Sequence, residues 1–209
     1  MNSHYNRVAG QSLERIAALS DGIFAVAMTL LVLDLRVPVL HAAHTEQALW
    51  DALRELAPRL LPYVMGFLTL GIFWLAQQAQ LNAFKHSDRT LTWLHIAFLL
   101  AVSLMPFSTS LLAEFIHFRL ALLVYWANLV LLGFMLLASW RYALRSELVK
   151  DEVPPELRHG MVQRILTYQA LYALGAVLGV VNTFLGIGFI ALLQLISAIG
   201  PRHRWLNKL

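Results

Sequence analysis

Residues 13–38, LERIAALSDGIFAVAMTLLVLDLRVP, decide the fold of this chain. The stretch is long enough to cross a bilayer as a helix, which takes about 20 mostly apolar residues. Ser20, Asp21 and Thr29 interrupt the apolar residues. Because an ionisable group inside a membrane span is costly, it marks a candidate functional site. We therefore expect this helix to carry the function.

Two faces of the expected helix differ in character. At about 100° per residue, one narrow stripe holds an aliphatic row with a single hydroxyl, made of Val26, Thr29, Leu30 and Leu33. The stripe continues toward the N-terminus through Gly22, Leu19 and Arg15. Asp21 projects about 140° away from Val26. An ordinary span, in which Ser and Thr hydroxyls bond to carbonyls of their own helix, is the alternative, but it leaves Asp21 unexplained.

The composition indicates an integral membrane protein. Of the 209 residues, 59% are hydrophobic and 13% are charged, against about half and a quarter in soluble domains. The absence of cysteine excludes disulfides and thiol chemistry. The net charge of +4 belongs to expected cytoplasmic loops, so no nucleic-acid partner is expected. A signal peptide over residues 22–33 is disfavoured because Asp21, Asp34 and Arg36 flank the run.

The hydropathy pattern predicts an all-α protein with six transmembrane helices in one subunit, residues 1–209, and no soluble domain. The expected spans are residues 13–35, 60–81, 91–112, 120–140, 165–181 and 183–199. Pro106 should break the third span, and a tight turn near Asn182 should separate the last two. We expect a short interfacial helix over residues 46–57, with Pro58 and Pro62 at the entry to the second span.

The basic residues predict the orientation. With six spans and the N-terminus inside, twelve of the sixteen Lys and Arg residues lie on the cytoplasmic side. This positive-inside bias places both termini in the cytoplasm. In the fifth span, Gly175 and Gly179 form a GxxxG pair that either lets two helices approach closely or reflects chance spacing.

Motifs for chemistry are missing from the sequence. There is no HExxH, P-loop, GxGxxG or catalytic Ser/His/Asp spacing, so we expect neither an enzyme nor a cofactor. The sequence also lacks the Arg spacing of a voltage sensor and a TVGYG-like filter. Three classes of function remain. They are ion permeation, transport along the stripe of the first helix, and a scaffold without a pathway.

A family resemblance narrows these options. The first span carries Arg15 followed four residues later by Leu19-Ser20-Asp21-Gly22, then Phe24-Ala25 and TLLVL at residues 29–33. The second and third spans add GIFW at residues 71–74, Asp88-Arg89, LTWL at 91–94 and SLMPF at 103–107. This pattern resembles the RxxxFSD signature and the following spans of the transmembrane protein 175 family of potassium channels. The likeness covers residues 13–115 and is weak beyond them.

The resemblance implies a homotetramer in a bacterial inner membrane, since single-repeat bacterial members form tetramers and two-repeat animal members form dimers. The first helix of each subunit would line a central pore for monovalent cations. Val26, Leu30 and Leu33 would form an aliphatic constriction, Thr29 a hydroxyl layer, and a permeant potassium ion would pass near Val26 and Thr29. A packing network outside the pore would comprise Arg15, Ser20, Asp21, Gln77 and His95.

Several positions depart from the family pattern. Leu19 stands where the family has Phe, and His95 stands where we expect Asn. Gln77 and Gln78 occupy a place often held by His, so Gln77 and His95 could exchange roles. Val26 replaces an Ile or Leu, which would widen the constriction slightly.

The leading hypothesis is a potassium-permeable leak-type channel that gates by wetting of its aliphatic ring. A secondary transporter that uses Asp21 as a cation or proton site is the first alternative, although no internal repeat supports it. A membrane scaffold without a pathway is the second.

Overall fold

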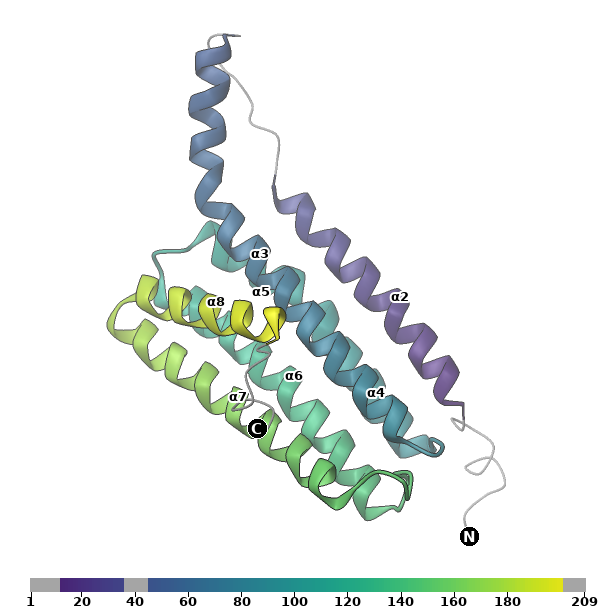
Figure 1. Cartoon of the computed structure of the whole chain (residues 1–209). Coiled ribbons are helices and arrows are strands. Elements are labelled where there is room, and N and C mark those ends of the chain that lie inside the picture. Colours follow the sequence, from purple (N-terminus) through teal and green to yellow (C-terminus); the bar gives the residue numbers. More distant parts are fainter. Residues whose placement is uncertain (1–11, 36–44, 201–209) are drawn as a thin grey trace.

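The computed structural model describes residues 12–35 and 45–200 of the chain, and these residues are helical (Figure 1). The order of elements is α2 (Leu13–Leu31), η1 (Val32–Asp34), α3 (Glu46–Ala83), α4 (Arg89–Ser103), α5 (Met105–Glu114), α6 (Arg119–Arg145), α7 (Pro155–Val181) and α8 (Thr183–Ile199). Within the described ranges the only β-type pairing is a single bridge between Phe84 and Val149. The predicted all-α fold is confirmed.

The helical segments coincide in position with the six predicted spans. In the described part of the chain, four segments are long and apolar enough to cross a membrane, namely α3, α4 with α5, α6 and α7. Helix α8 is apolar but has only 17 residues. Helix α2 has 19 residues and carries Glu14, Arg15 and Asp21, which lower its hydropathy. Residues 36–44 of the predicted polar connector, which runs over residues 36–59, and the tail after residue 200 lie outside the described residues.

Both predicted helix breaks are confirmed. Leu104 separates α4 from α5, and Pro106 occupies the first turn of α5, where its missing N–H leaves no helical hydrogen bond unmade. Asn182 separates α7 from α8. Its side-chain Oδ1 accepts hydrogen bonds from the backbone N–H groups of Phe184 (2.9 Å) and Leu185 (3.3 Å), which caps α8.

The prediction of a separate interfacial helix over residues 46–57 was wrong. Residues 46–57 belong to α3, a continuous helix of 38 residues with Pro58 and Pro62 inside it. Each proline leaves the carbonyl four residues earlier without its helical partner. Those carbonyls belong to Arg54 and Pro58, which are exposed, so water can satisfy them. Figure 1 shows α3 changing direction near the prolines instead of ending.

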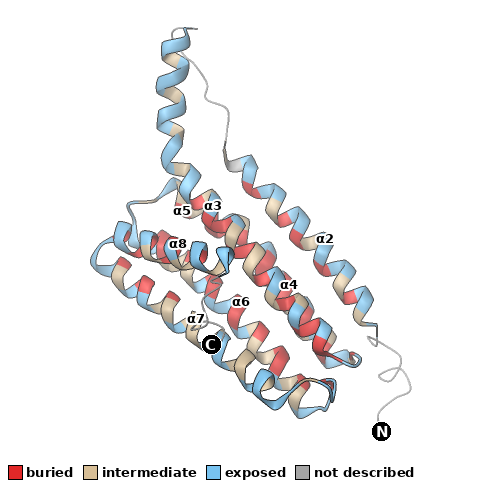
Figure 2. Cartoon of the chain, viewed as in Figure 1, coloured by how far each residue is buried: buried red, intermediate tan, exposed pale blue. Residues whose placement is uncertain are grey.

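Helix α2 packs along one side of the bundle (Figure 1). Its buried residues recur every three to four positions and face α3 and α4: Ile16, Ser20, Phe24, Ala27 and Leu31. Phe24 contacts Phe98 of α4 with ring centroids 6.0 Å apart, and Phe98 also meets Phe73 of α3 at 6.5 Å. The other face of α2 is exposed (Figure 2).

Helices α7 and α8 approach each other closely at glycines. A Cβ on Gly186 of α8 would lie 2.6 Å from the Cα of Gly179 and 2.7 Å from the carbonyl oxygen of Gly175, both on α7. Only a residue without a side chain fits at this crossing. The GxxxG pair therefore serves helix packing, so the interpretation as chance spacing is wrong.

Candidate functional site on the exposed face of α2

The predicted stripe of the first helix points away from its own subunit. Val26 is 56% exposed, Leu30 44% and Leu33 67%, and Thr29 is exposed beside them. Leu31, on the opposite face, is 1% exposed. The same helix thus has one face buried in the subunit and one aliphatic face that stays exposed beside the other described residues. Large exposed apolar surfaces of this kind mark contact sites.

Thr29 supplies the one hydroxyl among the four stripe residues. Its Oγ1 donates to the carbonyl oxygens of Ala25 (3.0 Å) and Val26 (2.9 Å) of the same helix. Because the hydroxyl proton is committed to the backbone, the oxygen lone pairs face the exposed side and can accept or ligate. An oxygen of this type can replace part of the hydration shell of a cation.

A buried hydrogen-bonded chain holds α2 to the bundle. Ser20 Oγ donates to the carbonyl oxygen of Ile16 (2.8 Å) and accepts from Gln77 Nε2 of α3 (3.0 Å). Gln77 Nε2 also lies 3.2 Å from His95 Nδ1 of α4. Gln77 Nε2 is an amide donor, so His95 Nδ1 is the acceptor in this contact. The structure thus brings together three predicted network residues, all fully buried.

Asp21 belongs to a second, separate contact. Its Oδ1 accepts hydrogen bonds from Trp74 Nε1 (2.8 Å) and Gln78 Nε2 (3.1 Å), both on α3. Neither Gln77 nor His95 bonds to Asp21, so the residues of the predicted network fall into separate contacts. Ser20 and Asp21 are adjacent and so point about 100° apart on the helix, toward different residues of α3.

Trp74 was not predicted as a partner of Asp21, although it belongs to the GIFW motif at residues 71–74. Trp74 and Gln78 are four residues apart, so they share one face of α3 and can reach one acceptor. That spacing was the available signal. The relative register of α2 and α3, which selects Trp74 over Gln77, could not be inferred from spacing alone.

Arg15 is not joined to the network within one subunit. Its side chain is exposed, and among the described residues its guanidinium makes no hydrogen bond or ion pair. Its backbone N–H donates a hydrogen bond to Ser12 Oγ (3.3 Å), and Ser12 thereby caps the N-terminus of α2.

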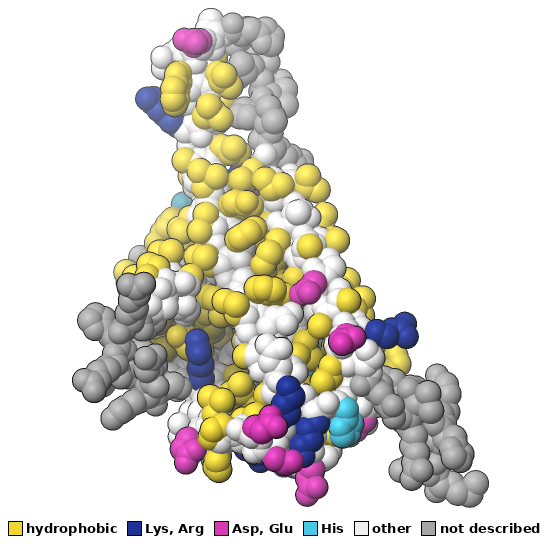
Figure 3. All heavy atoms as spheres, turned by 45° about the vertical axis from the view of Figure 1, so that its right-hand side comes forward, with side chains coloured by type: hydrophobic (Ala, Val, Ile, Leu, Met, Phe, Trp, Pro, Cys, Tyr) yellow, Lys and Arg dark blue, Asp and Glu magenta, His cyan; other side chains and the backbone are white. Residues whose placement is uncertain are grey.

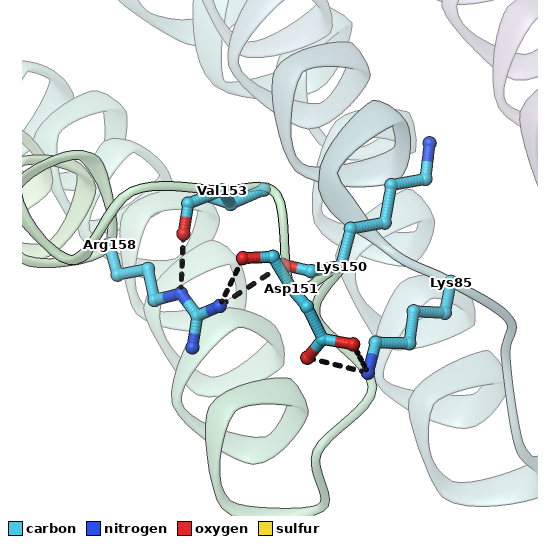
Figure 4. Close-up of polar contacts among 5 residues, drawn as sticks. All are labelled: Lys85, Lys150, Asp151, Val153 and Arg158. Atoms are coloured by element: carbon cyan, nitrogen blue, oxygen red, sulfur yellow. Dashed lines mark hydrogen bonds and ion pairs between the residues drawn. The ribbon is translucent and has the colours of Figure 1, made fainter.

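Polar contacts join the end of α3 to the loop between α6 and α7 (Figure 4). Lys85 Nζ binds both carboxylate oxygens of Asp151 at 2.9 and 2.8 Å, and Arg158 donates to backbone carbonyls of the loop between α6 and α7. Beside Lys85, Phe84 stacks on Trp140 (5.8 Å between centroids) and meets His95 edge-on (6.2 Å). The hydrogen bond and charge of Lys85 lower the pKa of the Asp151 carboxyl below its ordinary value.

The sequence of this chain is similar to a known family and to individual proteins. The family described as endosomal/lysosomal potassium channel TMEM175 matches residues 15–106. A potassium channel of Streptomyces collinus is 34% identical over 136 residues, which span 63% of this chain and 65% of that relative. A potassium channel of a Chryseobacterium species is 25% identical over 189 residues, 90% of this chain and 94% of that relative.

A solved structure shares the fold. The crystal structure of a lysosomal potassium-selective channel TMEM175 homolog from Chamaesiphon minutus superposes with a TM-score of 0.77. The match covers 91% of this chain and 98% of that one, at 24% sequence identity. The helical arrangement is therefore that of the homolog.

The fold and the site define a multi-pass α-helical protein of the bacterial cell membrane, with an exposed aliphatic face on its first helix. Over residues 15–106 the chain matches the TMEM175 family, and bacterial potassium channels are similar to it over most of its length.

Proposed function

We propose that this chain is the subunit of a potassium-permeable, leak-type cation channel, and not an enzyme. The match to this family supports a potassium channel, because bacterial relatives are named as such. The observation that carries the proposal is the exposed face of α2, since Val26, Leu30 and Leu33 are directed out of the subunit.

The proposed channel is a homotetramer with α2 of each subunit at the axis. Four copies of α2 around an axis place stacked aliphatic rings at the centre, because the exposed stripe of each α2 is directed out of its own subunit. A closed cyclic assembly satisfies each interface identically. Its narrow apolar rings exclude water and so gate by wetting, while the Thr29 oxygens offer replacement ligands to potassium.

The proposed orientation puts both termini in the cytoplasm, as the basic residues predict. In this orientation the loop containing Lys85 and Asp151 faces the cytoplasm, and the turn between α5 and α6 faces outside. Neither a resident cofactor nor a bound metal other than permeant potassium ions is part of the proposal.

The alternative of a transporter with Asp21 as its ion site is less well supported. Asp21 Oδ1 already accepts two hydrogen bonds, from Trp74 and Gln78, and the residue points away from the Val26 stripe. A structural carboxylate accounts for both facts.

Ion flux in purified proteoliposomes tests the proposal. Vesicles loaded with potassium and diluted into a buffer of an impermeant organic cation should lose potassium down its gradient without any coupled solute, while a protonophore balances the charge. A scaffold predicts no flux, and a coupled transporter predicts flux only with a second gradient or substrate. Either of these results would overturn the channel proposal.

A further inference from the structure

Helix α3 extends well beyond the bundle. Its 38 residues span about 57 Å at about 1.5 Å per residue, whereas the hydrocarbon core of a bilayer is about 30 Å thick. The first buried residue of α3 is Pro62. We call residues 46–59 the arm; Figure 1 shows the N-terminal end of α3 projecting from the other helices.

An ion pair marks where the arm leaves the apolar body. Arg59 Nη2 lies 2.7 Å from Glu114 Oε2 at the end of α5, and both side chains are partly exposed. Charged groups of this kind belong at the water boundary rather than among lipid tails. The arm on the far side of Arg59 therefore lies outside the hydrocarbon.

An apolar seam nevertheless runs along α3 from residue 50 to residue 74, through the arm and into the bundle. Its members recur at alternating spacings of three and four residues: Trp50, Leu53, Ala57, Leu60, Val64, Phe67, Gly71 and Trp74. The large residues of this seam are all exposed within the subunit, from 60% at Trp50 to 36% at Trp74. The average spacing of 3.5 residues is that of a helix that packs against other helices.

The polar groups of the arm lie on the other side. Asp51 accepts from Gln47 Nε2 (3.3 Å) and from Arg54 Nη1 (3.4 Å), so these three side chains tie one another together along the solvated face. Between Glu46 and Arg59, the charged residues are Asp51, Arg54 and Glu55, and none belongs to the seam. The arm is thus amphipathic, with its apolar side exposed among the described residues.

Lipid can cover the part of the seam that lies inside the bilayer, but it does not cover the arm. Inside the bilayer an outward apolar face is ordinary, yet the seam continues past Arg59 into water without a change of spacing. Because α3 is one continuous helix, the arm projects away from the bundle instead of lying along its end (Figures 1 and 3). The seam keeps the same residue spacing inside the bilayer and in water. This continuity indicates one protein partner along the whole seam.

We propose that the arm packs through the seam against the arm of a second copy of this chain. The inference rests on the proposed tetramer, in which Trp74, bonded to Asp21, puts the lower end of the seam beside α2. The seam then continues the subunit interface out of the membrane. Ala57 and Gly71 in the seam let neighbouring helices approach closely.

Disulfide trapping tests this inference, because the chain is naturally free of cysteine. Leu53→Cys lies in the seam, and Asp51→Cys, two residues away, lies on the solvated face. Full-length variants in membranes are oxidised with copper phenanthroline and run on non-reducing gels. Leu53→Cys should form about tenfold more dimer than Asp51→Cys, since only seam positions reach disulfide distance. Leu60→Cys is a second seam position should Leu53→Cys fail to fold.

Equal dimer from both faces, or none from the two seam variants, would overturn the inference and leave the arm to the membrane surface or to solvent. Flux measured on the wild type keeps the two proposals apart. Potassium flux without trapping at the seam overturns only the arm contact. Trapping at the seam without flux overturns only the channel.

Discussion

The indole Nε1 of Trp74 and the carboxylate Oδ1 of Asp21 lie 2.8 Å apart and join α3 to α2. Gln78, one turn further along α3, donates to the same oxygen at 3.1 Å. The buried Ser20 and Gln77 make a parallel contact between the same helices. Two neighbouring residues of α2 thus bind α3 at separate points, which fixes the rotation of α2 about its own axis and so the direction of its exposed stripe.

Loss of this contact should weaken the subunit without altering ion preference. Trp74→Phe keeps the ring but removes the donor, and an interhelical hydrogen bond in a membrane is worth about 0.6 to 1.7 kcal/mol. Asp21→Ala removes both bonds and should lower folded, assembled yield further, as measured by size-exclusion chromatography in detergent. A stable Asp21→Ala oligomer with changed ion selectivity would instead place Asp21 in the ion path.

The glycine crossing of α7 and α8 gives a matched pair of variants. Gly186→Ala puts a methyl group 2.6 Å from the Cα of Gly179, so the helices must separate. Overpacking of this type costs about 1 to 3 kcal/mol, and we expect a lower thermal midpoint in detergent. Gly188→Ala meets nothing within 4 Å and serves as the control. Equal midpoints for the two variants would contradict the close crossing.

Cysteine labelling in intact cells checks the proposed orientation. An impermeant maleimide should label Phe118→Cys in the exposed turn before α6 and leave Ser146→Cys, exposed at the other end of α6, unlabelled until the cells are opened. Ser87 is unsuitable as a probe because it is fully buried. Labelling of Ser146→Cys alone in intact cells would reverse the orientation.

The ion pair of Lys85 with Asp151 predicts a pH dependence. The pair forms in the folded state and lowers the pKa of Asp151 from its ordinary 3.8. Its contribution to stability is therefore present above pH 3.8 and lost as the pH falls through the lowered pKa. Thermal midpoints of the wild type and Asp151→Asn, measured from about pH 7 to about pH 3, should differ at the upper end and converge at the lower end. A constant gap would contradict the assignment.

Sequence periodicity predicted some of these features and not others. The spacing of Val26, Thr29, Leu30 and Leu33 identified the exposed face of α2, since one helix determines which residues share a side. The continuity of α3 through Pro58 and Pro62 was not predictable, because it depends on exposed carbonyls that water can satisfy. Trp74 as the partner of Asp21 depends on the register between two helices, and a single helix carries no information about that register.

The central claim is that the exposed face of α2 lines the ion path, and potassium flux through Leu30→Ala and Leu31→Ala proteoliposomes tests it most directly. Leu30 is 44% exposed and Leu31 is 1% exposed, although the two are adjacent. Leu30→Ala should raise flux by widening an apolar ring, whereas Leu31→Ala should lower stability by about 2 to 5 kcal/mol and leave flux per folded channel unchanged. Unchanged flux in Leu30→Ala together with altered flux in Leu31→Ala would contradict the claim.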